Sequence, residues 1–144
     1  MVFACGDVVV ESATPDLDEV LMLYRSVGWV TYVEAPQVLQ AALAGSTTVV
    51  VARRAAVLVG LARVISDGAT ICYLQDVLVH PEAQRAGIGR RLVEAALRPY
   101  GSVRQKVLLT DDEPGQRAFY ESLGYSETRD FGPGTLRAFV KFDQ

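Results

Sequence analysis

The chain has 144 residues, 50% of them apolar and 22% charged, which is enough to bury one core and leaves little room for a second. Its formal net charge of −3 argues against a nucleic-acid-binding surface, which needs clustered cations. No apolar stretch reaches the ~18 residues of a membrane span. The N-terminus also lacks the basic start and apolar core of a signal peptide. We therefore expect a cytoplasmic protein of one domain, residues 1–144.

The cysteines and the single histidine do not form a metal-binding pattern. Cys5 and Cys72 are far apart in the sequence, and reduced thiols are the simplest expectation for them. Because His80 is the only histidine, a zinc site would have to take most of its ligands from carboxylates. No metal is expected.

The first part of the chain carries the signals of one strand and two helices. Residues 8–11 are predicted to form a strand. Thr14 is predicted to cap a helix with Pro15 at its first position, and acidic residues follow in the first turn, where the helix dipole favours them. Gly28 is expected to end this helix. A second, short helix is predicted from Pro36 to Leu43.

Three strands are predicted next, at residues 47–52, 57–65 and 70–79. The first is β-branched and continuous, as in a buried strand. Asp67 and Gly68 form a strong hairpin signal between the second strand and the third. The three strands should therefore follow one another as an antiparallel meander.

The second half of the chain alternates helix and strand signals. A loop at residues 82–89 opens onto a helix that ends by residues 99–101. A strand at 106–110 and a helix at 114–123 follow, and a last hairpin is predicted with 136–140 as its better half. This order of elements indicates a mixed α/β (α+β) fold.

The loop at residues 84–89, Gln-Arg-Ala-Gly-Ile-Gly, lies directly before a helix. Its glycines allow close backbone approach, and the first N–H groups of a helix have no internal acceptor, so the loop predicts an anion site that fits a pyrophosphate. Arg85, Arg90 and Arg91 add positive charge there. The alternative is that the glycines only make a tight turn. The P-loop and the dinucleotide-binding G-x-G-x-x-G patterns are absent.

Two motifs resemble the signatures of the GNAT family of N-acetyltransferases. Gln84, Gly87 and Gly89 match the family core Q/R-x-x-G-x-G/A, and residues 117–125 are similar to its second signature, A-x-x-F-Y-x-x-x-G-F. Their order and separation also fit, so the resemblance spans most of the chain. It implies a GNAT fold with a mixed, mostly antiparallel central sheet of six to seven strands. That sheet would be splayed between strands 4 and 5 and flanked by about four helices.

The resemblance implies acetyl-CoA as cosubstrate, lying where the fourth and fifth strands separate. The loop amides would hold the pyrophosphate, and the pantetheine arm would lie along the fourth strand. A backbone N–H near Leu78 or Val79 would bind the acetyl carbonyl, most strongly when that oxygen becomes charged in the tetrahedral intermediate. The implied CoA-binding residues are Val77, Leu78, Val79, Gln84, Arg85, Ala86, Gly87, Ile88, Gly89, Arg90, Gln116 and Tyr120.

The implied reaction is direct attack of a primary amine on the thioester in a ternary complex, without an acyl-enzyme. Tyr120 holds the family's F-Y tyrosine position and is the candidate acid for the leaving thiolate, with core packing as the alternative. Asp76 stands in an otherwise apolar strand and is the candidate base or amine anchor. A structural hydrogen-bonding role, a water molecule as base, and Gln75 on the opposite face are the competitors. His80 is either a loop cap or a proton relay.

The acceptor pocket is expected to be lined by aromatic residues that can hold an aromatic or cationic amine. The candidates are Trp29, Tyr32 and Tyr73, with Gln75 beside them, and ordinary core packing is the alternative for each aromatic ring. The acceptor would be a small amine, such as a polyamine or an arylalkylamine, or a peptide amine. The residues do not choose among these.

One position departs from the family pattern. Gly115 stands where the family often has an asparagine that contacts CoA, so Gln116 or Arg117 would have to replace that contact. Two other functions stay open: a non-catalytic acyl-CoA-binding sensor, and a phosphate or nucleotide module outside the family. Homodimers are common in the family, but no sequence feature decides the oligomeric state.

Overall fold

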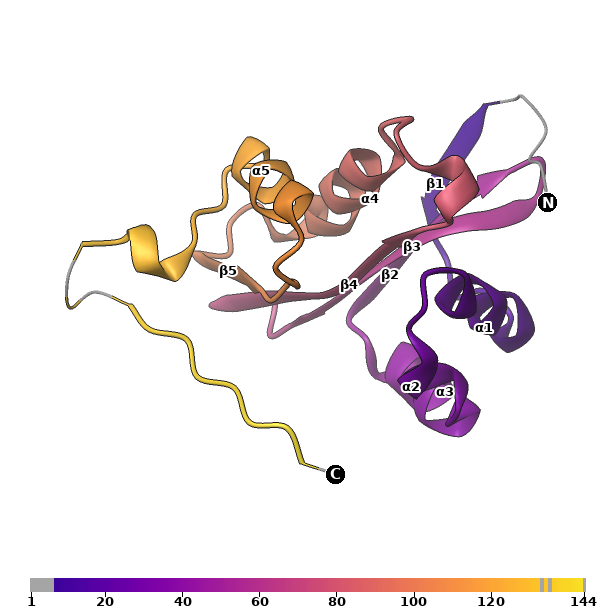
Figure 1. Ribbon diagram of the computed structural model, residues 1–144, viewed down its shortest axis with the longest axis horizontal. Coiled ribbons are helices and arrows are strands. Elements are labelled where there is room, and N and C mark those ends of the chain that lie inside the picture. The colour runs from indigo at the N-terminus through magenta and orange to yellow at the C-terminus, as the bar shows by residue number, and fades with distance from the viewer. Residues whose placement is uncertain (1–6, 133, 135, 144) are drawn as a thin grey trace. The chain divides into compact units, whose positions relative to one another are not determined.

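The computed structural model describes residues 7–132, 134 and 136–143, and it separates into two compact units, Met1–Leu109 and Thr110–Gln144. The first unit holds one sheet in the order β1-β2-β3-β4-β5 (Figure 1). Its strands are β1 Val8–Ser12, β2 Thr48–Arg54, β3 Val57–Ser66, β4 Ile71–Val79 and β5 Gln105–Leu108. Neighbouring strands are antiparallel except β4 and β5, which are parallel. The predicted α/β class and the mixed, mostly antiparallel sheet are therefore confirmed.

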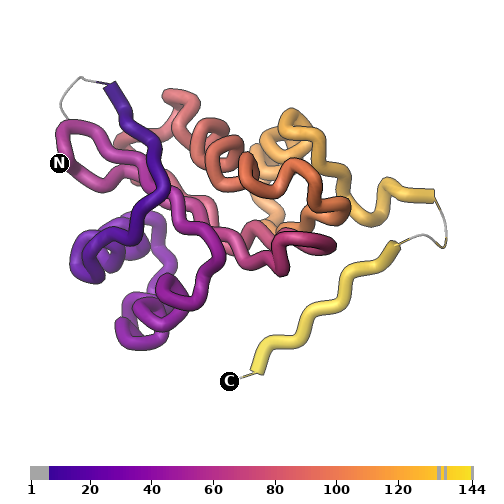
Figure 2. The backbone as a smooth tube through the Cα atoms, turned by 180° about the vertical axis from the view of Figure 1, so that it is seen from behind, coloured from indigo at the N-terminus to yellow at the C-terminus, as the bar shows by residue number. Residues whose placement is uncertain are grey.

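Helices cover both faces of this sheet. The first three helices lie on one face and α4 lies on the other, an arrangement that Figure 2 shows from behind. The α-helices of the first unit are α1 Leu17–Ser26, α2 Val30–Val33, α3 Pro36–Gly45 and α4 Ile88–Leu97. Two short 3-10 helices, Pro81–Ala83 and Arg98–Tyr100, flank α4. None of the helices in the described part of the chain is long and apolar enough to cross a membrane.

One hydrophobic core cluster lies between the sheet and the first three helices. Its buried members are Val20, Leu23, Tyr24, Leu39, Leu43, Val49, Val51, Leu58, Leu61 and Leu78. On the other face α4 buries Ile88, Leu92, Val93 and Ala96. A Cβ added at Gly60 of β3 would lie 2.8 Å from Cδ1 of Leu92, so a glycine is needed for α4 to pack this closely.

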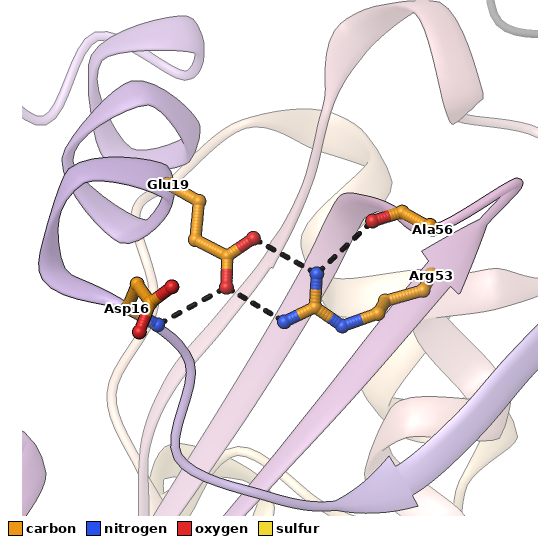
Figure 3. A network of polar contacts seen from close by, with 4 residues as sticks. All are labelled: Asp16, Glu19, Arg53 and Ala56. Carbon is orange, nitrogen blue, oxygen red and sulfur yellow. Dashed lines mark hydrogen bonds and ion pairs between the residues drawn. The ribbon is translucent and has the colours of Figure 1, made fainter.

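The hairpin between β2 and β3 has only two loop residues, Ala55 and Ala56, and both have left-handed backbone angles, with φ of 50° and 67°. This is the geometry of a type I′ turn, which asparagine and glycine favour. Arg53 supports the turn, because its Nη1 donates to the carbonyl of Ala56 at 3.2 Å (Figure 3).

The start of α1 differs from the prediction. Asp16, not Thr14, is the cap residue, and Glu19 in the first turn accepts a hydrogen bond from the Asp16 backbone at 3.0 Å. Glu19 also binds Arg53 of β2 through both carboxylate oxygens, at 2.7 and 2.8 Å (Figure 3). Thr14 is predicted as the cap because Pro15 suits the first helical position, but Pro15 lies before the helix and the cap falls two residues later. The acidic residues predicted for the first turn also suit a helix that is capped at Asp16.

The Glu19–Arg53 pair makes stability depend on pH. Hydrogen bonds from Arg53 hold the pKa of Glu19 below its ordinary value, so the pair stabilises the fold above the unfolded-state pKa and ceases to do so as pH falls through the folded-state pKa. We expect Glu19→Gln to lower the free energy of unfolding by about 0.5–1 kcal/mol at neutral pH, since both side chains are partly exposed. Urea denaturation measures this.

The same comparison repeated well below the carboxylate pKa supplies the control for that prediction. There the difference between Glu19→Gln and the unaltered protein should shrink, and Glu94→Gln, which removes a more exposed pair with Arg90, should have a smaller effect at neutral pH. If Glu19→Gln lowered the free energy of unfolding equally at both pH values, the ion pair between Glu19 and Arg53 would not be the cause of the loss.

The second unit contains α5, Pro114–Ser122, and a 3-10 helix, Thr128–Asp130. Arg117 joins them through ion pairs with Glu121 at 3.2 Å, Glu127 at 3.1 Å and Asp130 at 2.6 Å. The predicted helix at residues 114–123 is thus confirmed.

The predicted last hairpin is wrong for the residues that the structure describes. Residues 136–143 have no strand assignment, so the sheet has five strands in the described ranges, not six to seven. The mostly apolar composition of residues 136–140 favours a strand, but a strand exists only where another strand pairs with it. About four helices are expected, and the described residues form five α-helices, of which α2 is a single turn.

Candidate functional site

The strand β4 loses its neighbour on one side halfway along its length. β5 pairs with it only from Ile71 to Leu74, and the last pair joins Leu74 to Leu108. Among the described residues, the segment Gln75 to Val79 has β3 as its only strand partner. The predicted separation of the fourth and fifth strands therefore begins at Gln75. Backbone groups in this segment that do not face β3 are available to a bound molecule.

A β-bulge occupies the same place. Asp76 lies opposite Arg63, but Leu74 lies opposite Val64, so Gln75 between them has no partner on β3. Because Arg63 and Val64 are consecutive, they face opposite sides of the sheet, and so do Asp76 and Leu74. The two-residue alternation that the sequence suggests for β4 is therefore broken at Gln75.

The bulge brings two predicted site residues to one face. Tyr73 lies opposite Ile65, which shares a face with Arg63, so Tyr73 and Asp76 share the face that α1–α3 cover. In a regular strand these two positions, three residues apart, would face opposite sides. Gln75 itself is half-buried.

Asp76 is buried on this face, with 3% of its surface exposed, and two side chains hydrogen-bond to it. Its Oδ2 accepts a hydrogen bond from Nε of Arg63 at 2.6 Å and another from the hydroxyl of Tyr24 at 2.8 Å. Arg63 is 5% exposed and also donates from Nη1 to Oγ of Ser46 at 3.3 Å. The carboxylate thus has the partners that a buried charge needs.

The two donors to Asp76 keep their protons. Burial first, and then the charge of Asp76, raise the pKa of Tyr24 far above its ordinary value. Burial, the largest single influence, lowers the pKa of Arg63, but the charge of Asp76, its hydrogen bond and the nearby Tyr24 and Tyr32 together outweigh burial and leave this pKa above its ordinary value. The cluster therefore contains a cation, a carboxylate partner and a neutral phenol.

The predicted acceptor aromatics gather around this cluster. The ring of Tyr24 lies edge-on to Trp29 with centroids 5.8 Å apart and to Tyr32 with centroids 5.5 Å apart. Burial, followed by the charges of Asp76 and Tyr32, raises the pKa of Tyr73, which places Tyr73 in the same electrostatic environment. Each of the three predicted aromatic residues is half-buried, so it packs against the protein and is also partly accessible to a ligand. These residues are Trp29, Tyr32 and Tyr73.

The loop after β4 is anchored at its start. Nε2 of Gln84 donates to the carbonyl of Val79 at 3.1 Å, and Nδ1 of His80 accepts from the backbone of Glu82 at 3.2 Å. His80 therefore caps the 3-10 turn Pro81–Ala83. This is one of the two roles that the sequence left open for it.

The glycine loop has the geometry of an anion site. Gly87 caps α4 with φ of 77°, and Arg85 also has a positive φ, of 65°. A Cβ at Gly87 would meet no atom within 4 Å, so the backbone angle and not the space favours glycine there. Ile88 is buried and anchors the loop, whereas residues 84–87 are exposed. The exposed backbone thus leads directly into the positive end of the helix dipole.

The arginines near this loop have different surroundings. Arg90 forms an ion pair with Glu94 at 3.2 Å, and Arg91 donates to the carbonyl of Val8 at 3.0 Å. Arg85 is exposed, and the described residues offer it no ion pair. Among these three, Arg85 is the cation best able to meet a phosphate without giving up an ion pair or hydrogen bond to the described residues.

Tyr120 and Gln116 lie on α5, in the second unit. The ring of Tyr120 packs edge-on against Phe119 at 4.9 Å and Tyr125 at 6.0 Å between centroids. Burial and then the charge of Asp111 raise its pKa above the ordinary value, so the phenol keeps its proton at neutral pH. Gln116 is half-buried, and Gly115 is exposed with open space around it.

Sequence reasoning missed Tyr24 and Arg63. The ring of Tyr24 packs in the core, as an apolar residue of α1 would, and Arg63 lies within the predominantly apolar strand β3. An arginine inside the apolar run Leu58–Ile65 was the available signal, because it requires a buried carboxylate partner. Among the described residues, no three His, Cys, Asp or Glu side chains gather as a metal site would need.

Comparison with known proteins gives one family. The sequence profile described as "Acetyltransferase (GNAT) domain" matches residues 15–141. A Gibberella zeae protein named as a candidate acetyltransferase is 40% identical over 76 residues, 51% of this chain and 42% of that protein. A Pyropia yezoensis protein named as an uncharacterized N-acetyltransferase is 29% identical over 73 residues, with the same two shares. The chain thus spans less than half the length of these curated relatives.

Solved structures agree with this fold over nearly the whole chain. A GNAT family acetyltransferase from Streptococcus pneumoniae has a TM-score of 0.82 and 26% identity, covering 96% of this chain and 99% of that one. The acetyltransferase AAC(6′)-Iy, in complex with the bisubstrate analogue CoA-S-monomethyl-acetylneamine, has a TM-score of 0.72 and 16% identity, covering 96% and 99%. At that identity the second likeness shows the fold alone.

Proposed function

The chain belongs to the GNAT family of acetyltransferases, and from this we propose that it transfers an acetyl group from acetyl-CoA to a primary amine. The observation that carries the proposal is the place where β4 leaves β5. There the segment Gln75 to Val79, which has no second strand partner among the described residues, leads through the short 3-10 helix Pro81–Ala83 to the exposed glycine loop before α4. A long ligand with an amide-bearing arm and a pyrophosphate suits this combination.

In the proposed complex the loop residues Gln84 to Gly89 bind the pyrophosphate through backbone N–H groups, and Arg85 adds charge. Val77 and Val79 contribute strand-like backbone contacts to the pantetheine arm. An N–H near Leu78 or Val79 binds the acetyl oxygen, and this contact strengthens as that oxygen gains charge. Arg90 and Gln116 complete the proposed CoA contacts.

The proposed reaction forms one bond and breaks one. The amine nitrogen attacks the thioester carbon, the carbon–sulfur bond breaks, and the nitrogen loses a proton while the thiolate gains one. Holding the two reactants together can supply as much as ~7–11 kcal/mol, so positioning dominates. An alkylamine with a pKa near ~10.4 must first lose its proton, which at pH 7 costs roughly 4.6 kcal/mol. Tyr120 is the proposed proton donor to the thiolate.

The proposed acceptor site is the half-buried aromatic group on the α1–α3 face, formed by Trp29, Tyr32 and Tyr73, with Gln75 at its edge. Aromatic rings beside a fixed carboxylate favour an organic cation over a neutral ligand. A small amine, such as a polyamine or an arylalkylamine, or the amine of a peptide fits this chemistry.

Two measurements on the purified chain test the proposal. Calorimetry should show binding of CoA and no comparable binding of ATP. Acetyl-CoA mixed with a panel of amines should release free thiol only when an acceptor is present, with spermidine, tryptamine, an amino sugar and a short peptide as the panel. Binding of CoA without release would favour a non-catalytic sensor, and equal binding of ATP would favour a general phosphate site.

Gly87→Ala is the variant that isolates the loop. An alanine in the left-handed region is strained by ~1–2 kcal/mol, so the dissociation constant of CoA should rise about tenfold. Gly45→Ala is the matched control, since its Cβ would also meet nothing within 4 Å and its φ is not positive. Equal CoA affinity for both variants would place the pyrophosphate elsewhere.

A further inference from the structure

The buried cluster of Tyr24, Asp76 and Arg63 lies at the point where β4 is least supported by other strands. The bulge at Gln75 interrupts the pairing with β3, and the pairing with β5 ends at Leu74. Asp76 follows immediately and is held from two sides by charge-assisted or buried hydrogen bonds of 2.6 and 2.8 Å. Side chains thus restrain the strand where its backbone ladder is weakest.

We propose that Tyr24, Asp76 and Arg63 are positioning residues that hold the bulge of β4 and thereby set the backbone of residues 75–79 for the thioester. The structural part of this proposal concerns the strand alone, and its catalytic part rests on the proposed acetyl transfer. Asp76 acts through the strand and not by taking a proton from the acceptor.

The contacts of this cluster join β4 to β3, to α1 and to the residue that follows α3. Arg63 is the direct cross-strand neighbour of Asp76, so their bond fixes the register of β3 and β4. Tyr24 ties the same carboxylate to α1, and Ser46, which follows α3, accepts from Arg63 at 3.3 Å. The bulge can therefore shift only if a buried ion pair and a buried hydroxyl bond also change.

The groups around Asp76 favour a fixed orientation of its carboxylate. Tyr24 and Arg63 both keep their protons at neutral pH, and Tyr32 and Tyr73 are the other titratable groups near it. Its second oxygen, Oδ1, accepts no hydrogen bond from the described residues, so proton transfer at Oδ1 is the competing role. A base tethered in this way has little freedom to follow a substrate.

The consequence for rate follows from the precision that acyl transfer needs. A misplacement of about 1 Å in a reacting group can lower a rate by ~10²-fold. Within the described part of the chain, the amides of residues 75–79 have no second strand to correct their position, since β5 pairs only as far as Leu74. A modest loosening of the bulge should then lower kcat more than it alters the fold.

Tyr24→Phe is the test variant, because it removes one hydroxyl and keeps the ring that packs in the core. Amide hydrogen exchange of the ligand-free protein should become about tenfold faster at residues 75–79, as expected for one lost hydrogen bond to a charged group. Tyr100→Phe is the matched control, since it removes another buried hydroxyl, which bonds Thr48, outside the cluster. In the control, exchange at residues 75–79 should be unchanged.

Kinetics of the same two variants test the catalytic part. With the best acceptor found, Tyr24→Phe should lower kcat about tenfold and leave the midpoints of the pH–rate profile in place. Asp76→Asn keeps the shape of the side chain and an oxygen that can accept from Arg63; it should also lower kcat, expressed per folded molecule, and leave those midpoints in place.

Two results would overturn the proposal. Exchange at residues 75–79 that is equal in Tyr24→Phe and Tyr100→Phe would show that the cluster does not hold the strand, whether or not the protein acetylates amines. A normal kcat in Tyr24→Phe, together with loss of the acidic limb of the profile in Asp76→Asn, would make Asp76 the base. If no acceptor is turned over, faster exchange in Tyr24→Phe still supports the structural part.

Discussion

Replacing Asp76 with leucine is expected to lower the free energy of unfolding by about 3–5 kcal/mol, because it leaves the cation of Arg63 buried without its partner. The phenol of Tyr24 would lose its acceptor in the same step. Urea denaturation followed by circular dichroism measures the change. An effect of this size is a large part of the stability of a domain of this length.

The double variant Arg63→Met with Asp76→Leu separates the two possible causes of that loss. If the unpaired charge dominates, removing both charges should restore most of the stability, since an apolar pair of similar size often replaces a buried ion pair at little cost. Glu94→Gln, which breaks an exposed pair, should change stability by only ~0.3–0.5 kcal/mol. If Asp76→Leu lowered the free energy of unfolding as little as Glu94→Gln does, then Arg63 would bind water or another acceptor in that variant.

Tyr120→Phe is expected to lower kcat by ~10²–10⁴-fold, the range typical of losing a general acid. The raised pKa of Tyr120 keeps its phenol protonated at neutral pH, which a proton donor to the thiolate requires. The affinity for CoA should change little, because the ring and its edge-on packing against Phe119 and Tyr125 remain. Thiol release under saturating acetyl-CoA and acceptor measures kcat, and calorimetry measures the affinity.

Tyr100→Phe again serves as the control for that substitution, because it removes a tyrosine hydroxyl outside the proposed site. The kcat of Tyr100→Phe, expressed per folded molecule, should equal that of the unaltered protein. If Tyr120→Phe turns over as fast as this control, then a water molecule or another residue protonates the thiolate, and the transferase activity itself would stand.

Most of the fold could be predicted from local patterns. The β-branched run of β2, the Asp67-Gly68 turn and the strand-to-helix glycine loop each encode their own structure, and they occur where predicted. In the turn, the carboxylate of Asp67 accepts from the backbone of Ala69, Thr70 and Ile71. Such features depend on neighbours in sequence, so a single sequence is sufficient for them.

The features that could not be predicted depend on distant partners. The bulge exists because two strands pair out of step, and nothing within β4 marks Gln75 as the extra residue. Arg63 and Tyr24 lie 13 and 52 positions from Asp76, so their bonds become visible only once the sheet and α1 are assembled. The strand prediction for residues 136–140 is wrong because it, too, depends on a distant partner. These residues have the composition of a strand, but no strand among the described residues pairs with them.

The bulge gives β4 a residue, Gln75, that the pairing of β3 with β4 does not require. Val64 faces Leu74 and Arg63 faces Asp76, so a chain lacking Gln75 would pair these strands without interruption and keep every side chain on its present face. Packing, the buried ion pair and the meander could all exist in that shorter chain. The strand therefore holds one residue more than its architecture requires, and selection for stability alone gives no reason to retain it.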